Sequence, residues 1–243
     1  MKPQHTLKKL VAETMGTAFL LATVVGSGIM AEKLSAGNIS LALLENTLAT
    51  GAALVALILT FGPISGAHFN PAVTLADATQ GGIAWSLVPG YILAQCLGAF
   101  CGVYAAHLMF GQQVLQISAH ARTGSAQWFS EFVATFGLLS VIWGCSRARA
   151  AAVPFAVGCY ITAAYWFTAS TSFANPAVTL ARSFTNTFAG IRPTDAPAFI
   201  AAQLLGAIAA TMLFHWLSPA MTQTAKEIIV PHGDLESLEV RNS

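Results

Sequence analysis

Long apolar stretches alternate with short polar gaps along the chain. A helix needs about 20 mostly apolar residues to cross a bilayer, and the stretches reach or approach that length. Charged residues gather near the N-terminus, in the gaps and in the segment that follows Pro219. We therefore predict six membrane-spanning helices, with boundaries near residues 8–31, 41–61, 83–110, 127–147, 152–170 and 195–218.

The composition excludes an ordinary soluble domain. Of the 243 residues, 55% are hydrophobic and only 9% are charged, whereas a soluble domain carries about 25% charged residues. So few charges cannot cover a surface that faces water. The formal net charge is +1 and no basic stripe is present, so nucleic acid is not an expected partner. The sequence predicts an all-α membrane protein whose first partner is the lipid bilayer.

The distribution of lysine and arginine predicts the orientation in the membrane, because cytoplasmic segments are enriched in these residues. If the chain starts inside, an even number of spans returns the C-terminus to the same side. The inner segments then hold Lys2, Lys8, Lys9, Arg147, Arg149, Lys226 and Arg241, and the outer segments hold Lys33, Arg122, Arg182 and Arg192. We expect a multi-pass protein of the inner cell membrane with both termini in the cytoplasm.

Two segments are too short and too polar to be full spans, and they share one sequence. Residues 68–76 read HFNPAVTLA and residues 173–181 read FANPAVTLA. The chain is therefore an internal duplication, in which each copy has three spans and one short segment. Because three is odd, the second copy is inverted, which places a transport path between the copies. The expected units are a first repeat at 1–125, a second repeat at 126–218 and a cytoplasmic tail at 219–243.

The Asn-Pro-Ala triplet predicts the start of a short helix in each copy. Asparagine is a strong N-cap, and proline favours the first helical turn, where its missing N–H costs nothing. We expect half-membrane helices from Ala72 to about Gln80 and from Ala177 to about Thr187. Irregular backbone at the depth where they meet must be buried in protein or line a wet cavity. The pore motif then consists of Asn70, Pro71, Ala72, Asn175, Pro176 and Ala177.

Two facing helix N-termini create a positive potential of roughly half a charge each. The side-chain amides of Asn70 and Asn175 can donate to the oxygen of a passing molecule. A water molecule held in this way turns its hydrogens outward and cannot accept a proton along a wire. The motifs therefore predict a pore that water enters and protons do not cross.

Five segments carry a resemblance to a known family: AETMGTAFLLATVVGSG, SGAHFNPAVTLA, YILAQCLGA, SEFVATFGLL and SFANPAVTLAR. They resemble the aquaporin, or major intrinsic protein, family over about residues 8–218. The resemblance implies a bundle of six spans and two half-helices, a homotetramer and one pore in each subunit. It implies a channel rather than an enzyme, and we expect no cofactor. No metal site is expected either, because the four cysteines lack further ligands at metal spacing.

Two carboxylates lie inside predicted spans, at Glu13 and Glu131. An ionisable group at that depth is a functional candidate, for example in a proton relay. The resemblance favours a structural interpretation, in which both are buried acceptors for backbone N–H groups of the Asn-Pro-Ala loops. His68 precedes the first motif, and we expect it to line the cytoplasmic vestibule.

The chain departs from the family after the second motif. Most aquaporins have an arginine there, at the outer constriction, and this chain has Val178. Arg182 follows four residues later, at the position that Asp77 occupies in the first copy. One helical turn carries a residue about 5 Å along the axis, so we do not transfer the filter role to Arg182. We expect it to make a structural ion pair or a loop contact, which leaves the constriction without its fixed cation.

The other filter positions follow from counting back from the motifs. They map onto Thr50 in the second span and Ser172 before the second half-helix, with Val178 as the third member. The position in the fifth span is either Tyr165 or Ala163. If Tyr165 does not fill the space, the constriction is wider than that of a water-specific pore.

A wider filter favours neutral solutes larger than water. The segment AYWFTASTSFANPAVTLAR resembles a bacterial subgroup that is associated with arsenic resistance, which implies arsenious acid or methylated arsenicals as solutes. A glycerol facilitator and a plain water channel stay open as alternatives. A secondary transporter would need charges within its spans for coupling, and an intramembrane enzyme would need a nucleophile–base pair that we do not find.

Overall fold

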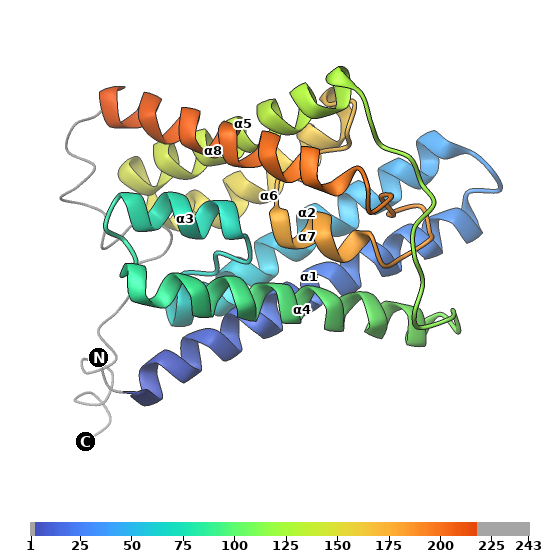
Figure 1. Ribbon diagram of the computed structural model, residues 1–243, viewed down its shortest axis with the longest axis horizontal. Coiled ribbons are helices and arrows are strands. Elements are labelled where there is room, and N and C mark those ends of the chain that lie inside the picture. Colours follow the sequence, from blue (N-terminus) through green and yellow to red (C-terminus); the bar gives the residue numbers. More distant parts are fainter. Residues whose placement is uncertain (1–2, 218–243) are drawn as a thin grey trace.

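The computed structural model describes residues 3–217 and is all-helical in that range (Figure 1). Six helical spans in this range are long and apolar enough to cross a membrane. Their α-helices are α1 (Pro3–Leu34), α2 (Ile39–Ser65), α4 (Val88–Met109), α5 (Ser125–Ala148), α6 (Val153–Phe167) and α8 (Ala196–Leu217). The span of α6 includes the 3₁₀ turn that precedes it, Ala150–Ala152. Two short helices, α3 (Pro71–Thr79) and α7 (Pro176–Arg182), contain the Asn-Pro-Ala motifs. The predicted architecture of six spans and two half-helices is confirmed.

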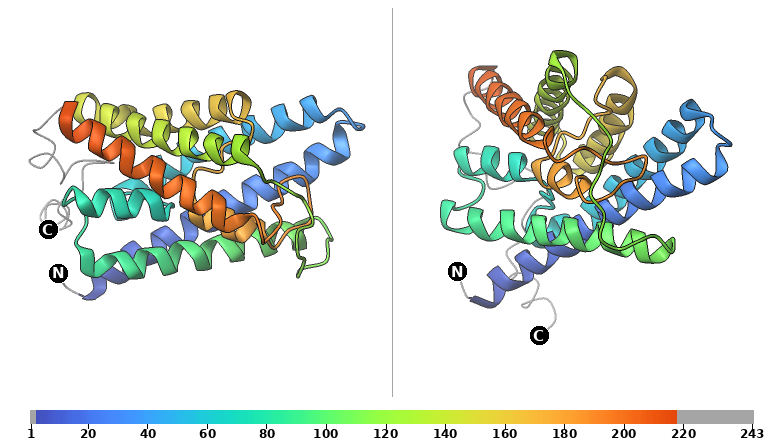
Figure 2. Two further views of the ribbon diagram at one scale, coloured as in Figure 1. Left: turned by 45° about the horizontal axis from the view of Figure 1, so that its top comes forward. Right: turned by 45° about the vertical axis from the view of Figure 1, so that its right-hand side comes forward.

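The helices pack as two equivalent sets. In the first set α1 lies against α2 and α4, and in the second set α5 lies against α6 and α8. The sets join where α2 meets α6, α3 meets α8 and α4 meets α7. Each half-helix therefore packs on the last helix of both sets, as an inverted repeat requires. Figure 2 shows α3 and α7 lying between the long helices.

Two faces of the bundle are used as reference below. The terminal face is the one at which α1 begins and α8 ends. The loop face carries the connections 110–124 and 183–195, at the right of Figure 1. The half-helix α3 runs from the middle of the bundle toward the terminal face, and α7 runs from the middle toward the loop face.

The asparagines start the half-helices as predicted. Asn70 and Asn175 have extended backbones, with φ of −153° and −159°. The Oδ1 atom of each accepts a hydrogen bond from the N–H of the alanine two residues later, at 2.9 and 3.0 Å. Proline occupies the first turn of both helices. The N-cap and the proline therefore fix where each half-helix begins.

The ends of the predicted spans differ from the structure by a few residues. Helix α2 continues past Pro63 to Ser65, where Gly66 takes a φ of 90° and donates its N–H to the carbonyl of Gly62. Helix α6 ends at Phe167 because Thr168 is extended. The predicted tail at 219–243 lies outside the described residues, as do three of the cations used for the orientation, Lys2, Lys226 and Arg241.

The predicted end of the second half-helix is wrong. Helix α7 ends at Arg182, five residues before the expected Thr187. The carbonyl of Arg182 accepts a hydrogen bond from the N–H of Ile191 in the following connection, at 3.2 Å. That carbonyl is therefore no longer available to a further turn of the helix, and the chain folds back over the loop face.

The outer surface of the bundle is apolar, as a lipid-facing surface should be. Large hydrophobic side chains point away from the protein on several long helices, for example Phe19 (52% exposed), Leu97 (53%) and Met212 (69%). Buried polar side chains gather instead around the two half-helices. This inside-out pattern places the polar chemistry of the protein along its axis.

Close packing within each set depends on glycine. A Cβ atom at Gly98 in α4 would lie 2.2 Å from the carbonyl oxygen of Thr14 in α1. A Cβ atom at Gly206 in α8 would lie 2.4 Å from the carbonyl oxygen of Phe132 in α5. Both obstacles are backbone atoms that cannot rotate away. Small residues at such crossings are what bring membrane helices into close contact.

We predict that Gly98→Ala destabilises the bundle. Overpacking costs about 1–3 kcal/mol, and in a chain of this length each kcal/mol lowers the unfolding midpoint by about 2–4 °C. The measurement is the apparent midpoint of thermal unfolding in detergent. Gly144→Ala is the matched control, because a Cβ atom there would stay 3.6 Å from Phe214. Equal midpoints for the two variants would contradict the prediction.

Candidate functional site

The two half-helices are joined at their N-termini by a reciprocal pair of hydrogen bonds. Asn70 donates from Nδ2 to the carbonyl oxygen of Ala174 at 2.7 Å. Asn175 donates from Nδ2 to the carbonyl oxygen of Phe69, also at 2.7 Å. Each motif therefore fixes the loop that precedes the other, and the two copies meet at a single point in the middle of the bundle.

The same asparagines keep a donor free for a guest molecule. An amide NH₂ group has two hydrogens, and the reciprocal bonds use one from each. Asn70 and Asn175 line one cavity together with Phe69 and Ala174. The N-termini of α3 and α7 add partial positive charge at this point. The centre of the bundle therefore favours an oxygen atom that accepts hydrogen bonds and disfavours a cation.

The loops before the half-helices have an unusual backbone. Ala67 and Phe69 both have φ of 48° in the first loop, and Ser172 and Ala174 have φ of 51° and 48° in the second. Residues with a Cβ atom rarely adopt this left-handed conformation, which costs roughly 1–2 kcal/mol for each residue. The surrounding structure must therefore hold both loops in place.

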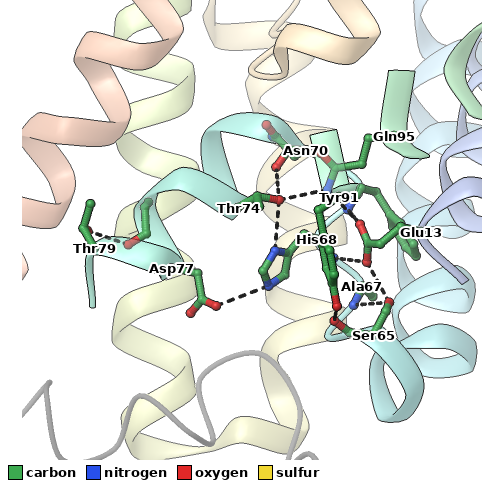
Figure 3. Close-up of polar contacts among 12 residues, drawn as sticks. Glu13, Ser65, Ala67, His68, Asn70, Thr74, Asp77, Thr79, Tyr91 and Gln95 are labelled. Carbon is green, nitrogen blue, oxygen red and sulfur yellow. Dashed lines mark hydrogen bonds and ion pairs between the residues drawn. The ribbon is translucent and has the colours of Figure 1, made fainter. Parts of the chain in front are cut away.

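Glu13 holds the first loop (Figure 3). Its Oε1 accepts hydrogen bonds from the hydroxyl of Ser65 at 2.6 Å and the N–H of His68 at 3.0 Å. Its Oε2 accepts from the N–H of Phe69 and from Nε2 of Gln95, both at 2.8 Å. The carboxylate is fully buried and has four donors around it. Hydrogen bonds of this kind to a charged acceptor are stronger than neutral ones.

Glu131 holds the second loop in the same way. Its two oxygens accept hydrogen bonds from the N–H groups of Phe173 and Ala174, both at 2.9 Å. Nε2 of Gln203 donates to Oε2 at 2.5 Å. The same Gln203 nitrogen donates to Thr179 in α7, as Gln95 does to Thr74 in α3. Both glutamates thus lie where the interpretation of them as buried acceptors requires.

A narrow cavity of about 70 Å³ runs past both asparagines, with room for a few water-sized molecules. One wall is polar and is formed by the two loops and the motifs. The opposite wall is apolar and comes from the long helices, with Leu20, Val24, Leu54, Ile58, Leu138, Ile142, Val153, Val157 and Ile161. The long helices also contribute the hydroxyl groups of Thr50 and Tyr165, so a solute in this cavity meets apolar side chains along most, but not all, of that wall.

The structure brings the predicted filter residues together. Thr50, Tyr165, Ser172 and Val178 all line the cavity, whereas Ala163 is exposed on the outside of α6. Of the two alternatives in the fifth span, Tyr165 is therefore the one that faces the path. Its hydroxyl donates to Oγ1 of Thr50 at 3.4 Å. The hydroxyl of Ser172 is buried and has no hydrogen-bond partner within residues 3–217.

Arg182 makes the expected loop contact, because its Nε donates to the carbonyl of Ala189. No carboxylate forms an ion pair with it within residues 3–217. The side chain is 2% exposed, and its guanidinium carbon lies 3.4 Å from the centre of the Phe173 ring. Arg182 also lines the cavity. A basic side chain therefore lies in the wall of the cavity, although the usual filter position holds Val178.

A second arginine, which the sequence reasoning missed, comes from the connection 110–124. Arg122 is 8% exposed and donates from Nε to the carbonyl of Gly190 at 2.9 Å. Its backbone N–H donates to Asp195 at 2.9 Å, and its guanidinium lies 5.1 Å from the centre of the Phe173 ring. Burial lowers the pKa of the Arg122 side chain to about 10, so it stays charged at neutral pH. Nothing in a polar loop sequence marks such a residue.

His68 lines the cavity on the terminal side of the asparagines. Its Nδ1 lies 3.0 Å from Oγ1 of Thr74, and its Nε2 lies 3.5 Å from Oδ2 of Asp77 (Figure 3). The ring also packs against Tyr91, with 5.4 Å between the ring centres. Sequence reasoning singled out His68 but gave Asp77 no role. The seven-residue spacing from Asn70 to Asp77, repeated from Asn175 to Arg182, is the signal that could have found it.

Comparison with known proteins agrees with this geometry. The chain matches the family described as major intrinsic protein over two overlapping segments, residues 1–169 and 145–239. It is 55% identical over 224 residues to aquaglyceroporin AqpS of Rhizobium meliloti (strain 1021), which covers 90% of this chain and 96% of that protein. It is 32% identical over 215 residues to aquaporin NIP1-3 of Oryza sativa subsp. japonica, which covers 86% of this chain and 73% of that protein.

A solved structure has the same fold. The X-ray structure of the aquaglyceroporin from Plasmodium falciparum superposes with a TM-score of 0.65 and covers 90% of this chain and 99% of that chain. The sequence identity is 19%, so this likeness concerns the fold alone. The family match and the identity to relatives extend over most of the chain. This multi-pass membrane protein therefore belongs to the major intrinsic protein family, the family of the aquaporin and aquaglyceroporin channels for water and small solutes.

Proposed function

We propose that this protein is a passive channel whose filter admits neutral hydroxylated solutes larger than water, with arsenious acid and methylated arsenicals among them. The observation that carries the proposal is the lining of the cavity beside Val178. Three small or hydroxylated side chains, Thr50, Ser172 and Val178, stand along the path where most members of the family narrow it with an arginine. Glycerol is the principal alternative solute, and water passes as well.

The two walls of the cavity suit such solutes. Polar groups on one wall can bind hydroxyl oxygens, and the apolar wall can accept a carbon chain, a methyl group or the arsenic atom. A neutral trihydroxide and a triol have similar size and present the same hydroxyl groups. The name of the Rhizobium meliloti relative, an aquaglyceroporin, supports a solute of this class. A cation would lose its hydration without a counter-ion in the cavity wall to replace it.

The remaining expectations about the assembly belong to the same proposal. The lysine and arginine distribution supports cytoplasmic termini and an inner-membrane location. The resemblance to the family supports a homotetramer with one pore in each subunit. Equivalent packing of α1–α4 and α5–α8 supports a division of the chain near residues 125 and 126.

We predict that vesicles containing the wild-type protein take up water, glycerol and arsenite, and that Val178→Arg reduces glycerol and arsenite uptake by about tenfold or more. The added side chain narrows the path beside position 178, and a barrier that is higher by about 1.4 kcal/mol already lowers a rate tenfold. The measurement is solute-resolved permeability from stopped-flow light scattering and from arsenic retained in the vesicles. If wild-type vesicles take up water but neither glycerol nor arsenite, the wide-filter proposal is wrong.

Val178→Met is the matched control for this variant. Methionine adds length at the same position without adding a charge. If the arginine acts by charge and hydrogen bonding, the methionine variant keeps more of the solute uptake. If only the width matters, the two variants lose uptake to a similar degree.

A secondary transporter is the alternative that the buried glutamates raise. We predict that solute flux is linear in concentration and independent of a proton gradient, because the carboxylate oxygens of Glu13 and Glu131 already accept hydrogen bonds from the loops.

Glu131→Gln leaves a backbone N–H without its acceptor, which costs about 1–3 kcal/mol. We expect a lower unfolding midpoint in detergent and uncoupled flux through the protein that folds.

The control for Glu131→Gln is Glu45→Gln, a partly exposed glutamate with no assigned hydrogen bond. It should leave both the unfolding midpoint and the flux unchanged. Saturable uptake that follows a proton gradient in the wild type, and disappears in Glu131→Gln, would contradict the channel and support a transporter.

A further inference from the structure

The guanidinium of Arg182 has donors that the protein does not use. Only its Nε has a hydrogen-bond acceptor within residues 3–217, the carbonyl of Ala189. Its terminal NH₂ groups have no hydrogen bond there and do not belong to the fully enclosed polar atoms. Because Arg182 lines the cavity, these groups face the path. A buried arginine keeps its charge, so the path has a fixed cation in its wall.

Two contacts hold that cation in one position. The face of the Phe173 ring lies 3.4 Å from the guanidinium carbon, a cation–π stack. The ring itself is fixed, because the N–H of Phe173 donates to Glu131 and the ring packs edge-on against Phe199 at 5.3 Å. The carboxylate of Glu131 also attracts Arg182 electrostatically. The guanidinium is therefore pre-organised, as a selectivity element must be.

The position of Arg182 relative to its motif carries an ionisable side chain in both halves of the inverted repeat. Asp77 and Arg182 each lie seven residues after the asparagine of their motif, and His68 and Phe173 each lie two residues before it. In the first half His68 and Asp77 are 3.5 Å apart, and in the second half Phe173 stacks on Arg182. Equivalent side chains thus meet in both halves, but the side chain seven residues after the asparagine is acidic in the first half and basic in the second.

Arg122 extends the positive region on the loop side. Its guanidinium lies 5.1 Å from the centre of the Phe173 ring, to which Arg182 also binds. The two arginines repel one another. Asp195 accepts a hydrogen bond from the backbone N–H of Arg122, not from its guanidinium. Two guanidinium groups therefore lie close to the Phe173 ring, and that of Arg182 belongs to a residue that lines the cavity.

We propose that Arg182, seated on Phe173, is the specificity-determining cation of this pore, displaced by one helical turn from the usual filter position at Val178. There it repels cations and donates hydrogen bonds to the oxygens of neutral solutes. The displacement leaves the path beside Val178 wide enough for solutes larger than water. This inference rests on the proposed channel function and adds to it the residue that excludes cations.

The test is ion permeability of vesicles that contain Arg182→Gln. A unit charge at about 6 Å in a medium of effective dielectric constant about 20 changes the permeability of a monovalent cation by about a hundredfold. We expect a rise of that order in potassium permeability, measured by dissipation of a potassium gradient. The reading is taken only in vesicles that pass water, which shows that the pore is folded and open. Arg149→Gln, at an exposed position, is the matched control and should keep potassium excluded.

A rescue variant tests whether loss of the Arg182 charge, rather than a change in the fold, raises the potassium permeability. In Val178→Arg combined with Arg182→Gln, the cation returns to the usual filter position, so we expect potassium exclusion to be restored and glycerol uptake to fall. If Arg182→Gln does not fold, Phe173→Leu is the second variant. It keeps the arginine and removes the ring that seats it, and we expect an intermediate rise in potassium permeability.

An Arg182→Gln channel that passes water and still excludes potassium would overturn the inference. So would a Phe173→Leu channel with unchanged potassium exclusion. Failure of the proposed function has a different signature, since wild-type vesicles would then take up no glycerol or arsenite. The two failures are thus distinguished by the wild-type uptake alone.

Discussion

The reciprocal hydrogen bonds between the two Asn-Pro-Ala motifs are the constraint on which the rest of the structure depends. Asn70 and Asn175 each donate across to the carbonyl that precedes the other motif. These bonds form only if both half-helices begin at the same depth, with their N-termini facing one another. Two short helices must therefore be brought to one point inside a membrane. Three features serve that requirement: the equivalent packing of the six long helices, the glycines where these helices cross, and the return of both loops to the bundle axis.

Buried glutamates make that arrangement stable without making it reactive. The loops run through left-handed conformations that cost free energy, and their N–H groups have no water to bind at this depth. Glu13 and Glu131 satisfy those N–H groups and are in turn held by Gln95 and Gln203. A carboxylate whose lone pairs are already occupied in this way holds backbone in place rather than carrying a proton. The geometry therefore fits a path with fixed walls, through which solutes diffuse passively.

The fold could be predicted almost completely from the sequence, and the site only in part. The length of the apolar stretches predicted the six spans. The duplicated motif predicted the inverted repeat and the first residues of the half-helices. The end of α7 was predicted wrongly. The N–H of Ile191 bonds to the carbonyl of Arg182, and no local sequence signal encodes that contact. Tyr165 could not be separated from Ala163 by counting, since the connection after α6 has a different length from its counterpart. Arg122 was missed because its position depends on Gly190 and Asp195, far away in the sequence.

The loss of an arginine at position 178 has a different meaning once the helix is seen in three dimensions. On a helix, residues four apart lie on the same face, so Val178 and Arg182 both line the cavity. Moving the cation by one turn separates two properties that a single filter arginine would combine, the width of the path and its charge. Under the proposed function, Val178 keeps the path wide and the guanidinium stacked on Phe173 keeps it positive. Selection for larger uncharged molecules over cations requires both conditions at once.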